Sequence, residues 1–246
     1  MADRRLRFLE HIVELRKRLL VTAATIAVTA TASFFYAVPL LKLMLIPAEM
    51  DGKPLRLVYL SPLEPFMVKM KIALFCGVAL AMPVIFYQLI AFIAPALRTK
   101  EKKIVYPSIV LLVILFFTGV VFGYKFIMPV GTQWLLNQAG EIMRASVSAS
   151  QYVTYAGWFL LGFGISFETP LFILLLVRLG ILKPAQLRKS WRYALIIILV
   201  LAAVITPDWS PVTMAIMAGP MLIFYLLSVL VAPLVAPKPK LIEEES

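Results

Sequence analysis

Apolar and polar residues divide the chain into six apolar segments, separated by charged or turn-rich stretches. The segments cover residues 19–41, 72–97, 104–128, 153–177, 192–206 and 212–232. A helix needs about 20 apolar residues to cross about 30 Å of hydrocarbon, and the first four segments reach this length. The pattern predicts an all-α, polytopic integral membrane protein with six transmembrane helices, built as one domain over residues 1–246.

The last two segments predict a short helical hairpin. The fifth segment, 192–206, is too short for an ordinary span, and it runs into Thr-Pro-Asp-Trp-Ser-Pro at residues 206–211. Such a sequence breaks a helix. We expect the turn of this hairpin to lie at a shallow depth, in a protein-lined cavity or under a locally thinned bilayer. Residues 233–246 then form a tail.

The N-terminal stretch 5–18 mixes charged residues with apolar residues at helical spacing. This pattern predicts an amphipathic helix that lies on the membrane surface and leads into the first span. It is not typical of a cleavable signal peptide, because Glu10 and Glu14 interrupt the basic stretch and the span that follows has full membrane length.

Composition supports a membrane protein and excludes several other classes. Hydrophobic residues make up 62% of the chain, and its mean hydropathy is +0.93. A soluble domain is usually about 45–50% apolar, so an ordinary soluble enzyme is excluded. One cysteine, Cys76, and one histidine, His11, rule out a disulfide framework and a multi-ligand Cys/His metal site. We expect neither a cofactor nor a metal.

The net charge of +11 reflects membrane topology. If the chain alternates sides at each span, 17 of the 24 basic residues lie on the side of the termini and 7 on the other side. Basic residues concentrate on the cytoplasmic side, so both termini are predicted to be cytoplasmic, in a cell inner (plasma) membrane. Attraction to anionic lipid is a further expectation, and binding to nucleic acid is not expected.

Few residues suit catalysis, and one acidic residue stands out by its position. His11 lies before the first span, where it cannot serve an intramembrane Ser-His hydrolase, and the chain has no P-loop. No enzymatic activity is therefore expected. Glu168 lies deep in the fourth span, where an ionisable group is costly and often functional. The alternative is a structural hydrogen bond near Pro170.

Three further acidic residues have ordinary interpretations when each is taken alone. Glu14 is placed for an ion pair with Arg18 one helical turn later, Glu101 is a solvated loop charge, and Asp208 is a turn residue. Glu14 and Glu101 are, however, single acids among basic residues at the same predicted face. Such a pair could accept guanidinium groups at two fixed points, which suits a ligand with adjacent arginines.

Three motifs in order give the chain a resemblance to a known family. They are Phe-Leu-Glu-His-Ile-Val-Glu-Leu-Arg-Lys-Arg-Leu at 8–19, Ala-Phe-Ile-Ala-Pro-Ala-Leu at 91–97, and Gly-Ile-Ser-Phe-Glu-Thr-Pro at 164–170. Together they closely resemble TatC, the receptor subunit of the twin-arginine protein translocase. The resemblance covers essentially the whole chain. It implies a glove-shaped, concave molecule in which the fifth and sixth helices are short.

The resemblance implies roles for individual residues. Glu14 and Glu101 match the two carboxylates associated with binding the twin-arginine signal peptide. Residues of the same motifs would shape that site: Leu9, His11, Arg16, Phe92, Pro95 and Lys102. Glu168 matches a polar residue on the concave side. Pro47 and the segment 61–66, with Ser61 and Pro62, match an external loop important for assembly, and Asp208 matches the acid of the turn between helices five and six.

The resemblance also implies a function and partners. The chain would be a signal-peptide receptor and core subunit that exports folded proteins using the proton-motive force, with single-span TatA- and TatB-type subunits and other TatC copies as partners. Family members can carry a Gln near the start of the sixth helix and a Glu further along it. Here these places read Val212-Thr213 and Tyr225-Leu226, and Thr213 is the residue that could substitute in part.

Two other functions fit the membrane pattern less well. A proton-coupled secondary transporter could use Glu168 as a relay, but it should carry more intramembrane ionisable groups and a clear repeat. An integral membrane lipid enzyme would need more catalytic groups than the chain offers.

Overall fold

The structure is a computed structural model that describes residues 2–50, 53–96, 99–137, 146–206 and 210–236. Most of the described chain is helical. The helices are α1 (Ala2–Phe35), α2 (Ala37–Leu45), α3 (Glu64–Ile93), the 3-10 turn η1 (Ala94–Ala96), α4 (Thr99–Phe122), the π-helical turn η2 (Gly123–Ile127), α5 (Met128–Asn137), α6 (Ala149–Arg178), α7 (Pro184–Lys189), α8 (Trp191–Ile205) and α9 (Pro211–Val235). The all-α prediction is confirmed.

Four short strands lie in the connections between helices. β1 (Glu49–Met50) pairs with β2 (Lys53–Pro54) in antiparallel fashion, and β3 (Leu57–Val58) pairs with β4 (Val147–Ser148) in parallel fashion. The second pairing joins the segment before α3 to the segment before α6, because Leu57 lies opposite Val147.

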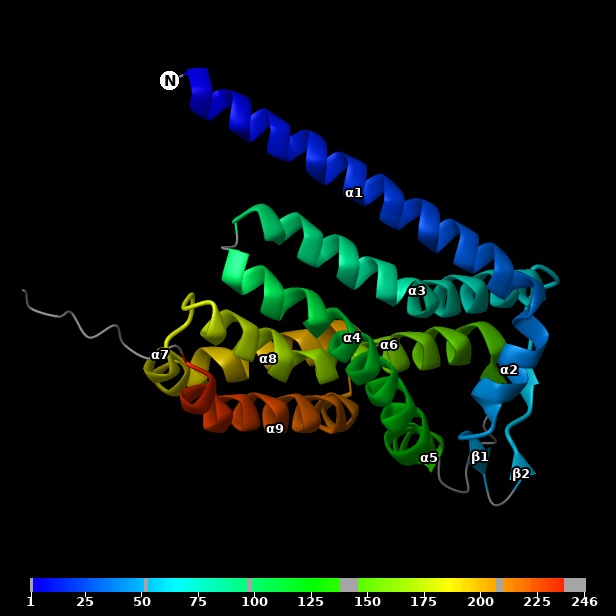
Figure 1. The fold of residues 1–246 in the computed structure, drawn as a ribbon. Helices are drawn as coiled ribbons and strands as arrows, with labels where there is room; N and C mark the ends of the chain where they lie inside the picture. The colour runs from blue at the N-terminus through cyan, green and yellow to red at the C-terminus, as the bar shows by residue number, and fades with distance from the viewer. Residues whose placement is uncertain (1, 51–52, 97–98, 138–145, 207–209, 237–246) are drawn as a thin grey trace, which may run out of the picture.

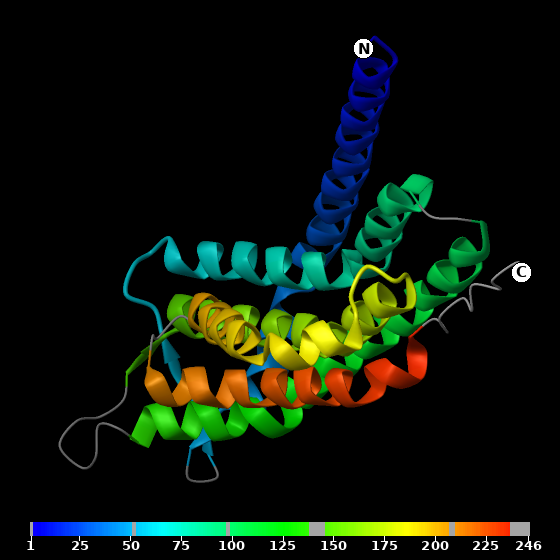
Figure 2. The same cartoon turned by 90° about the vertical axis from the view of Figure 1, so that its left-hand side faces the viewer.

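The helices form a bundle with α6 in a central position. α1 packs on α3, α3 packs on α4 and α6, and α6 also contacts α4 and α9, while α8 packs mainly on α9 (Figure 1). Figure 2 shows that α1 leans away from the other helices towards its N-terminus. α1 therefore lies at the edge of the bundle, with α3 as its main partner.

Five helical stretches of the described chain are long and apolar enough to cross a membrane: His11–Phe35, Glu64–Ile93, Lys102–Asn137, Ala149–Arg178 and Pro211–Val235. α8, with 15 residues, is the shorter apolar helix among those described. The predicted short fifth helix is confirmed. The implied short sixth helix is wrong, because the apolar sequence of α9 stays helical for 25 residues and passes Pro233 without a break.

The hairpin of α8 and α9 ends partway along α6 (Figure 1). A methyl group added at Gly162 would meet Ile205 at the end of α8 and Met217 near the start of α9. Gly162 is 13 residues after Ala149, the first residue of α6, which corresponds to about 20 Å of helix. The two helices therefore end well short of the start of α6.

The first span differs from its prediction at both ends. α1 is one uninterrupted helix from Ala2 to Phe35, so 5–18 is continuous with the span that follows it. It extends the axis of the span. The predicted span 19–41 is too long, because α1 ends at Phe35 and α2 runs in a new direction. Tyr152 and Tyr124 fix α2 by donating hydrogen bonds to the carbonyl groups of Met44 and Leu43.

The second and third spans are longer than predicted. α3 begins at Glu64 and not at residue 72, and the helical stretch that starts with α4 continues through η2 and α5 to Asn137, beyond the predicted end at residue 128. The predicted spans 153–177, 192–206 and 212–232 agree with α6, α8 and α9 to within four residues at each end.

A glycine allows α1 and α3 to pack closely. A Cβ atom at Gly77 would lie 2.6 Å from the Cα and N atoms of Ala30, so only glycine lets the two backbones approach this far. Thr29 also donates a hydrogen bond to the carbonyl oxygen of Gly77 at 2.8 Å. Small residues and such hydrogen bonds are the usual means of helix association in membranes.

Candidate functional site

Glu14 lies at one end of the bundle, where the N-terminal half of α1 faces the C-terminal part of α3. We call this the Glu14 end. Arg18, one turn later on α1, donates from Nε at 3.1 Å and from Nη2 at 2.5 Å to the same carboxylate oxygen, Oε1. The predicted pairing of Glu14 with Arg18 is confirmed. Both side chains are partly exposed, at 31% for Glu14 and 23% for Arg18.

Arg18 also connects α1 to α3. Its Nη1 donates a hydrogen bond of 3.2 Å to Oε1 of Gln88. The sequence analysis did not identify Gln88, because its partner is 70 residues away and an isolated glutamine in an apolar helix has no distinctive spacing. Glu14, Arg18 and Gln88 thus form a continuous polar chain across the α1–α3 contact.

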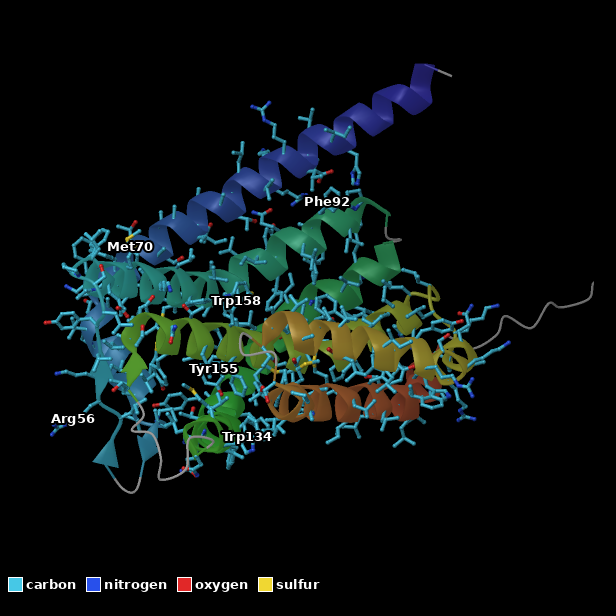
Figure 3. All side chains as sticks on the ribbon, turned by 180° about the vertical axis from the view of Figure 1, so that it is seen from behind. Arg56, Met70, Phe92, Trp134, Tyr155 and Trp158 are labelled. Carbon is cyan, nitrogen blue, oxygen red and sulfur yellow. The ribbon has the colours of Figure 1, made fainter. Side chains whose placement is uncertain are left out.

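His11 and Phe92 form the second part of this end. Their rings are stacked, with centroids 4.3 Å apart and an interplanar angle of 19°. Nδ1 of His11 lies 3.9 Å from Oε2 of Glu14. Figure 3 shows Phe92 near the end of α3, beneath α1. The structure therefore brings together three of the predicted site residues.

Of the other residues predicted for this site, the structure describes the side chains of three and only the backbones of two. Arg16 is exposed on α1, Pro95 is exposed in η1, and Lys102 is partly exposed near the start of α4. The side chains of Leu9 and Glu101 lie outside the described part of the chain, although their backbones belong to α1 and α4. The pairing of Glu14 with Glu101 at one ligand stays a prediction.

Glu168 lies in the interior of the bundle, apart from the Glu14 end. Its side chain is 2% exposed on α6, beside the backbone of Phe116 on α4. Neither carboxylate oxygen has a hydrogen-bond partner among the described residues. The structural alternative raised for Glu168, a hydrogen bond near Pro170, therefore has no support in the described part.

The start of α9 contains a second buried polar residue. Thr213 is fully buried, and its hydroxyl group donates to the carbonyl oxygen of Ser210 at 3.1 Å. Val212 and Leu226 are exposed, whereas Tyr225 is buried and donates a hydrogen bond to the carbonyl oxygen of Leu187. Thr213 is thus turned into the protein, while the hydroxyl group of Ser210 caps the start of α9 by accepting from the N–H of Val212.

The residues matched to the external loop lie at the opposite end of the bundle, with α2, the strands and the start of α3. We call this the Glu64 end. Pro47 is buried after α2, and Ser61 and Pro62 are exposed in the turn before α3. Asp208 lies outside the described residues.

Glu64 joins two connections at this end. Its Oε1 accepts hydrogen bonds from the hydroxyl group of Ser148 at 2.5 Å and from the backbone N–H of Ser150 at 3.0 Å, and Oε2 accepts from the N–H of Leu60 at 2.6 Å. Glu64 therefore fastens the segment before α3 to the start of α6. The sequence signal for it is an acid between two prolines at the first turn of a helix.

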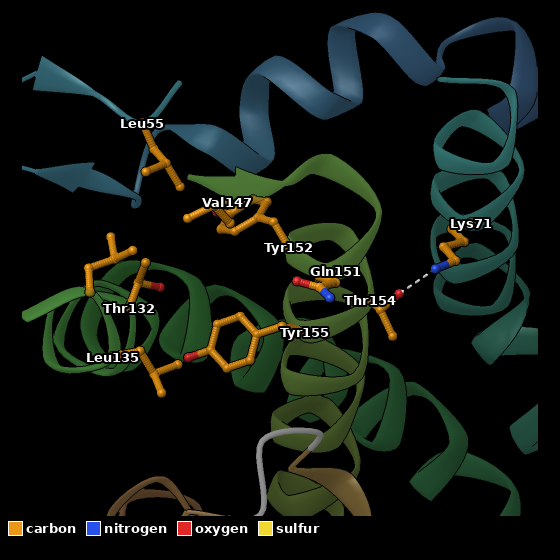
Figure 4. Close-up of a pocket in the computed structure, with 10 residues that line it drawn as sticks. Leu55, Lys71, Thr132, Leu135, Val147, Gln151, Tyr152, Thr154 and Tyr155 are labelled. Carbon is orange, nitrogen blue, oxygen red and sulfur yellow. Dashed lines mark hydrogen bonds between the residues drawn. The ribbon is translucent and has the colours of Figure 1, made fainter. Parts of the chain in front are cut away.

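Lys71 reinforces the same connection about two turns further along α3. Its Nζ donates to the hydroxyl groups of Ser150 at 2.6 Å and Thr154 at 2.8 Å, the second of which is drawn in Figure 4. A cavity of about 510 Å³ adjoins these residues, between α5, α6 and the segment that contains Leu55.

The groups at the Glu14 end have the chemistry to accept a cation. Oε1 of Glu14 is engaged by Arg18, and Oε2 accepts no hydrogen bond from the described residues. A guanidinium group could bind Oε2, and the stacked rings of His11 and Phe92 offer a flat surface beside it. Among the described residues no group of three or more His, Cys, Asp or Glu side chains could hold a metal.

The fold defines a helical, multi-span membrane protein, and one end of its bundle carries a partly exposed carboxylate beside two stacked rings. Residues 10–220 match the family described as Sec-independent protein translocase protein (TatC). The TatC proteins of Carboxydothermus hydrogenoformans and of Helicobacter pylori are 33% identical over 238 residues and 35% identical over 230 residues. These alignments cover 97% and 94% of this chain, and 97% and 88% of the relatives.

The fold comparison agrees. A crystal structure of the twin-arginine translocase receptor TatC matches with a TM-score of 0.83 at 30% identity, over 92% of this chain and 99% of that chain. The chain belongs to the TatC family. The resemblance seen in the sequence is confirmed, and the transporter and lipid-enzyme alternatives are left without support, since the family has a transport role in protein translocation.

Proposed function

We propose that this protein is the signal-peptide receptor and core subunit of a twin-arginine translocase, and that the Glu14 end binds the consecutive arginines of the signal peptide. The observation that carries the proposal is the state of the Glu14 carboxylate. One of its oxygens is fixed by Arg18, and the other, beside the stacked rings of His11 and Phe92, accepts no hydrogen bond from the described residues.

This arrangement favours arginine over lysine as the ligand. A guanidinium group presents several N–H donors in one plane, so it can donate to Oε2 of Glu14 while its flat face lies on the ring of His11 or Phe92. An ammonium group is a point charge without such a plane. Glu101, at the start of α4, would supply the second carboxylate, for the second arginine.

The same proposal covers topology and partners. Six helices would cross the membrane with both termini in the cytoplasm, because 17 basic residues lie on that side. The Glu14 end would then face the precursor before export. Glu168 and Thr213 would serve contacts with TatA- and TatB-type subunits, other copies of this chain would complete the complex, and the proton-motive force would supply energy.

Measurement of peptide binding by the purified protein tests the proposal. We expect Glu14→Gln to weaken binding of a twin-arginine peptide about tenfold, since a charge-assisted hydrogen bond at a partly exposed site contributes on the order of 1.5 kcal/mol. Lys17→Gln, which changes the charge of the same exposed helix segment by one unit in the opposite direction, is the control and should bind at least as well as the unchanged protein. Equal affinity of Glu14→Gln and the unchanged protein would refute the assignment.

A further inference from the structure

Gln88 has no role in the proposed site so far, yet its position connects it to that site. It lies on α3, one turn before Phe92, and accepts a hydrogen bond of 3.2 Å from Nη1 of Arg18. The other two donor groups of the same guanidinium, Nε and Nη2, both reach Oε1 of Glu14. One arginine therefore connects the candidate ligand-binding carboxylate to the neighbouring helix.

The contact with Gln88 fixes a side chain that would otherwise be mobile. A Glu–Arg pair one turn apart on a helix is a weak interaction when both side chains are partly exposed, and Arg loses much rotamer entropy when it is ordered. The pair alone would hold the Glu14 carboxylate weakly. A third contact from another helix restricts the guanidinium, and the guanidinium in turn restricts Glu14.

Whether Arg18 assists or competes with the ligand depends on how many oxygens of the Glu14 carboxylate it binds. If Arg18 covered both oxygens, it would compete with an incoming arginine and weaken binding. It donates only to Oε1, while Oε2 faces His11 at 3.9 Å. An ionised carboxylate has about four acceptor positions, so Oε2 can accept a second guanidinium while Arg18 stays in place.

We propose that Gln88 is a positioning residue of the peptide site: it holds Arg18, and Arg18 turns the open oxygen of Glu14 towards the ligand beside His11 and Phe92. The inference rests on the proposed function, because it assumes that Glu14 binds the arginines. It adds a residue of α3 to the determinants of peptide affinity, although Gln88 does not touch the peptide.

Substitution of Gln88 tests this role. Gln88→Met keeps the length of the side chain and removes the acceptor, and we expect binding of a twin-arginine peptide to weaken about two- to tenfold, the range of one net hydrogen bond. Gln88→Glu keeps an acceptor for Arg18 and should restore affinity to within about twofold of the unchanged protein. Tyr87→Phe, at the exposed neighbouring position of α3, is the control and should not change affinity.

A double-mutant cycle separates positioning from a general structural effect. In a Glu14→Gln background, Gln88→Met should cause no further loss of affinity, because Arg18 no longer has a carboxylate to position. An equal loss in both backgrounds would overturn the proposal, and so would a gain of affinity in Gln88→Met, which would show that Arg18 competes with the peptide. Failure of the proposed function is a different result: Glu14→Gln alone would then leave binding unchanged.

Discussion

Replacement of Gly77 by alanine should separate the two helices that form the candidate peptide site. A Cβ atom at this position would lie 2.6 Å from backbone atoms of Ala30, whereas ordinary contacts begin at 3.4 Å. The obstacle is backbone and cannot rotate aside, so α1 and α3 must move apart by about 1 Å or tilt. Such a change would also stretch the 2.8 Å hydrogen bond from Thr29 to the Gly77 carbonyl group.

The expected cost follows from three contributions. Overpacking of a close contact costs about 1–3 kcal/mol, and loss of an interhelical hydrogen bond in a membrane protein costs about 0.6 kcal/mol. Against these, alanine is favoured over glycine within a helix by about 0.5–1 kcal/mol. The net destabilisation is about 1–3 kcal/mol, which corresponds to a fall in Tm of about 4–8 °C for 2 kcal/mol in a chain of this length.

Thermal unfolding of the detergent-purified protein at one scan rate is the assay, with Gly219→Ala as the matched control. Gly219 is also within an apolar helix, but a Cβ atom there would meet nothing within 4 Å. Its substitution should leave Tm unchanged or raise it slightly. If Gly77→Ala were as stable as Gly219→Ala, the close contact between α1 and α3 would be wrong. Peptide affinity should fall in Gly77→Ala, since the Glu14 end spans both helices.

Three further substitutions test the interior and the Glu64 end. Tyr152→Phe removes the hydrogen bond to the Met44 carbonyl group and should lower the free energy of unfolding by about 1 kcal/mol, measured as a lower Tm. Glu64→Gln replaces one carboxylate oxygen by an NH2 group, which cannot accept the hydrogen bond of the donor that faces it. The segment before α3 should then be held less firmly, so proteolysis of residues 49–63 should become faster. Glu168→Gln should leave Tm unchanged or raise it. It puts a neutral amide in place of a buried carboxyl group that has no hydrogen-bond partner among the described residues. A lower Tm would show a partner that binds the carboxylate.

Hydrophobic patterning predicts the ends of a helix well where the polar residues that bound it have no partners inside the bundle. It failed at the start of α3, because Lys69 and Lys71 were interpreted as residues outside the span. Lys71 is instead hydrogen-bonded to Ser150 and Thr154 of α6. A polar residue that finds partners across the bundle can lie within a long helix, and a single sequence does not show such partners.

The break between α1 and α2 has a similar origin. Pro39 is a local signal for this break, because it lacks an N–H and its ring would clash with the carbonyl group of Phe35, but the apolar pattern continues through it and predicts a longer span. α2 is held in its own direction by the hydroxyl groups of Tyr124 and Tyr152, which come from distant parts of the chain. Local propensity has no information about these contacts.

The candidate site was predictable only as far as its residues share one helix or one motif. The pair of Glu14 and Arg18 follows from their spacing of four residues, and the nearness of His11 follows from its spacing of three. The placement of Phe92 came from the resemblance to TatC, and Gln88 came from neither. These two residues lie on α3, so the geometry that leaves one oxygen of Glu14 open depends on the packing of α1 against α3. That packing depends on Gly77, about 16 Å away from Gln88 along α3. A perturbation in the middle of the bundle should therefore reach the peptide site without any change in the residues that contact the peptide.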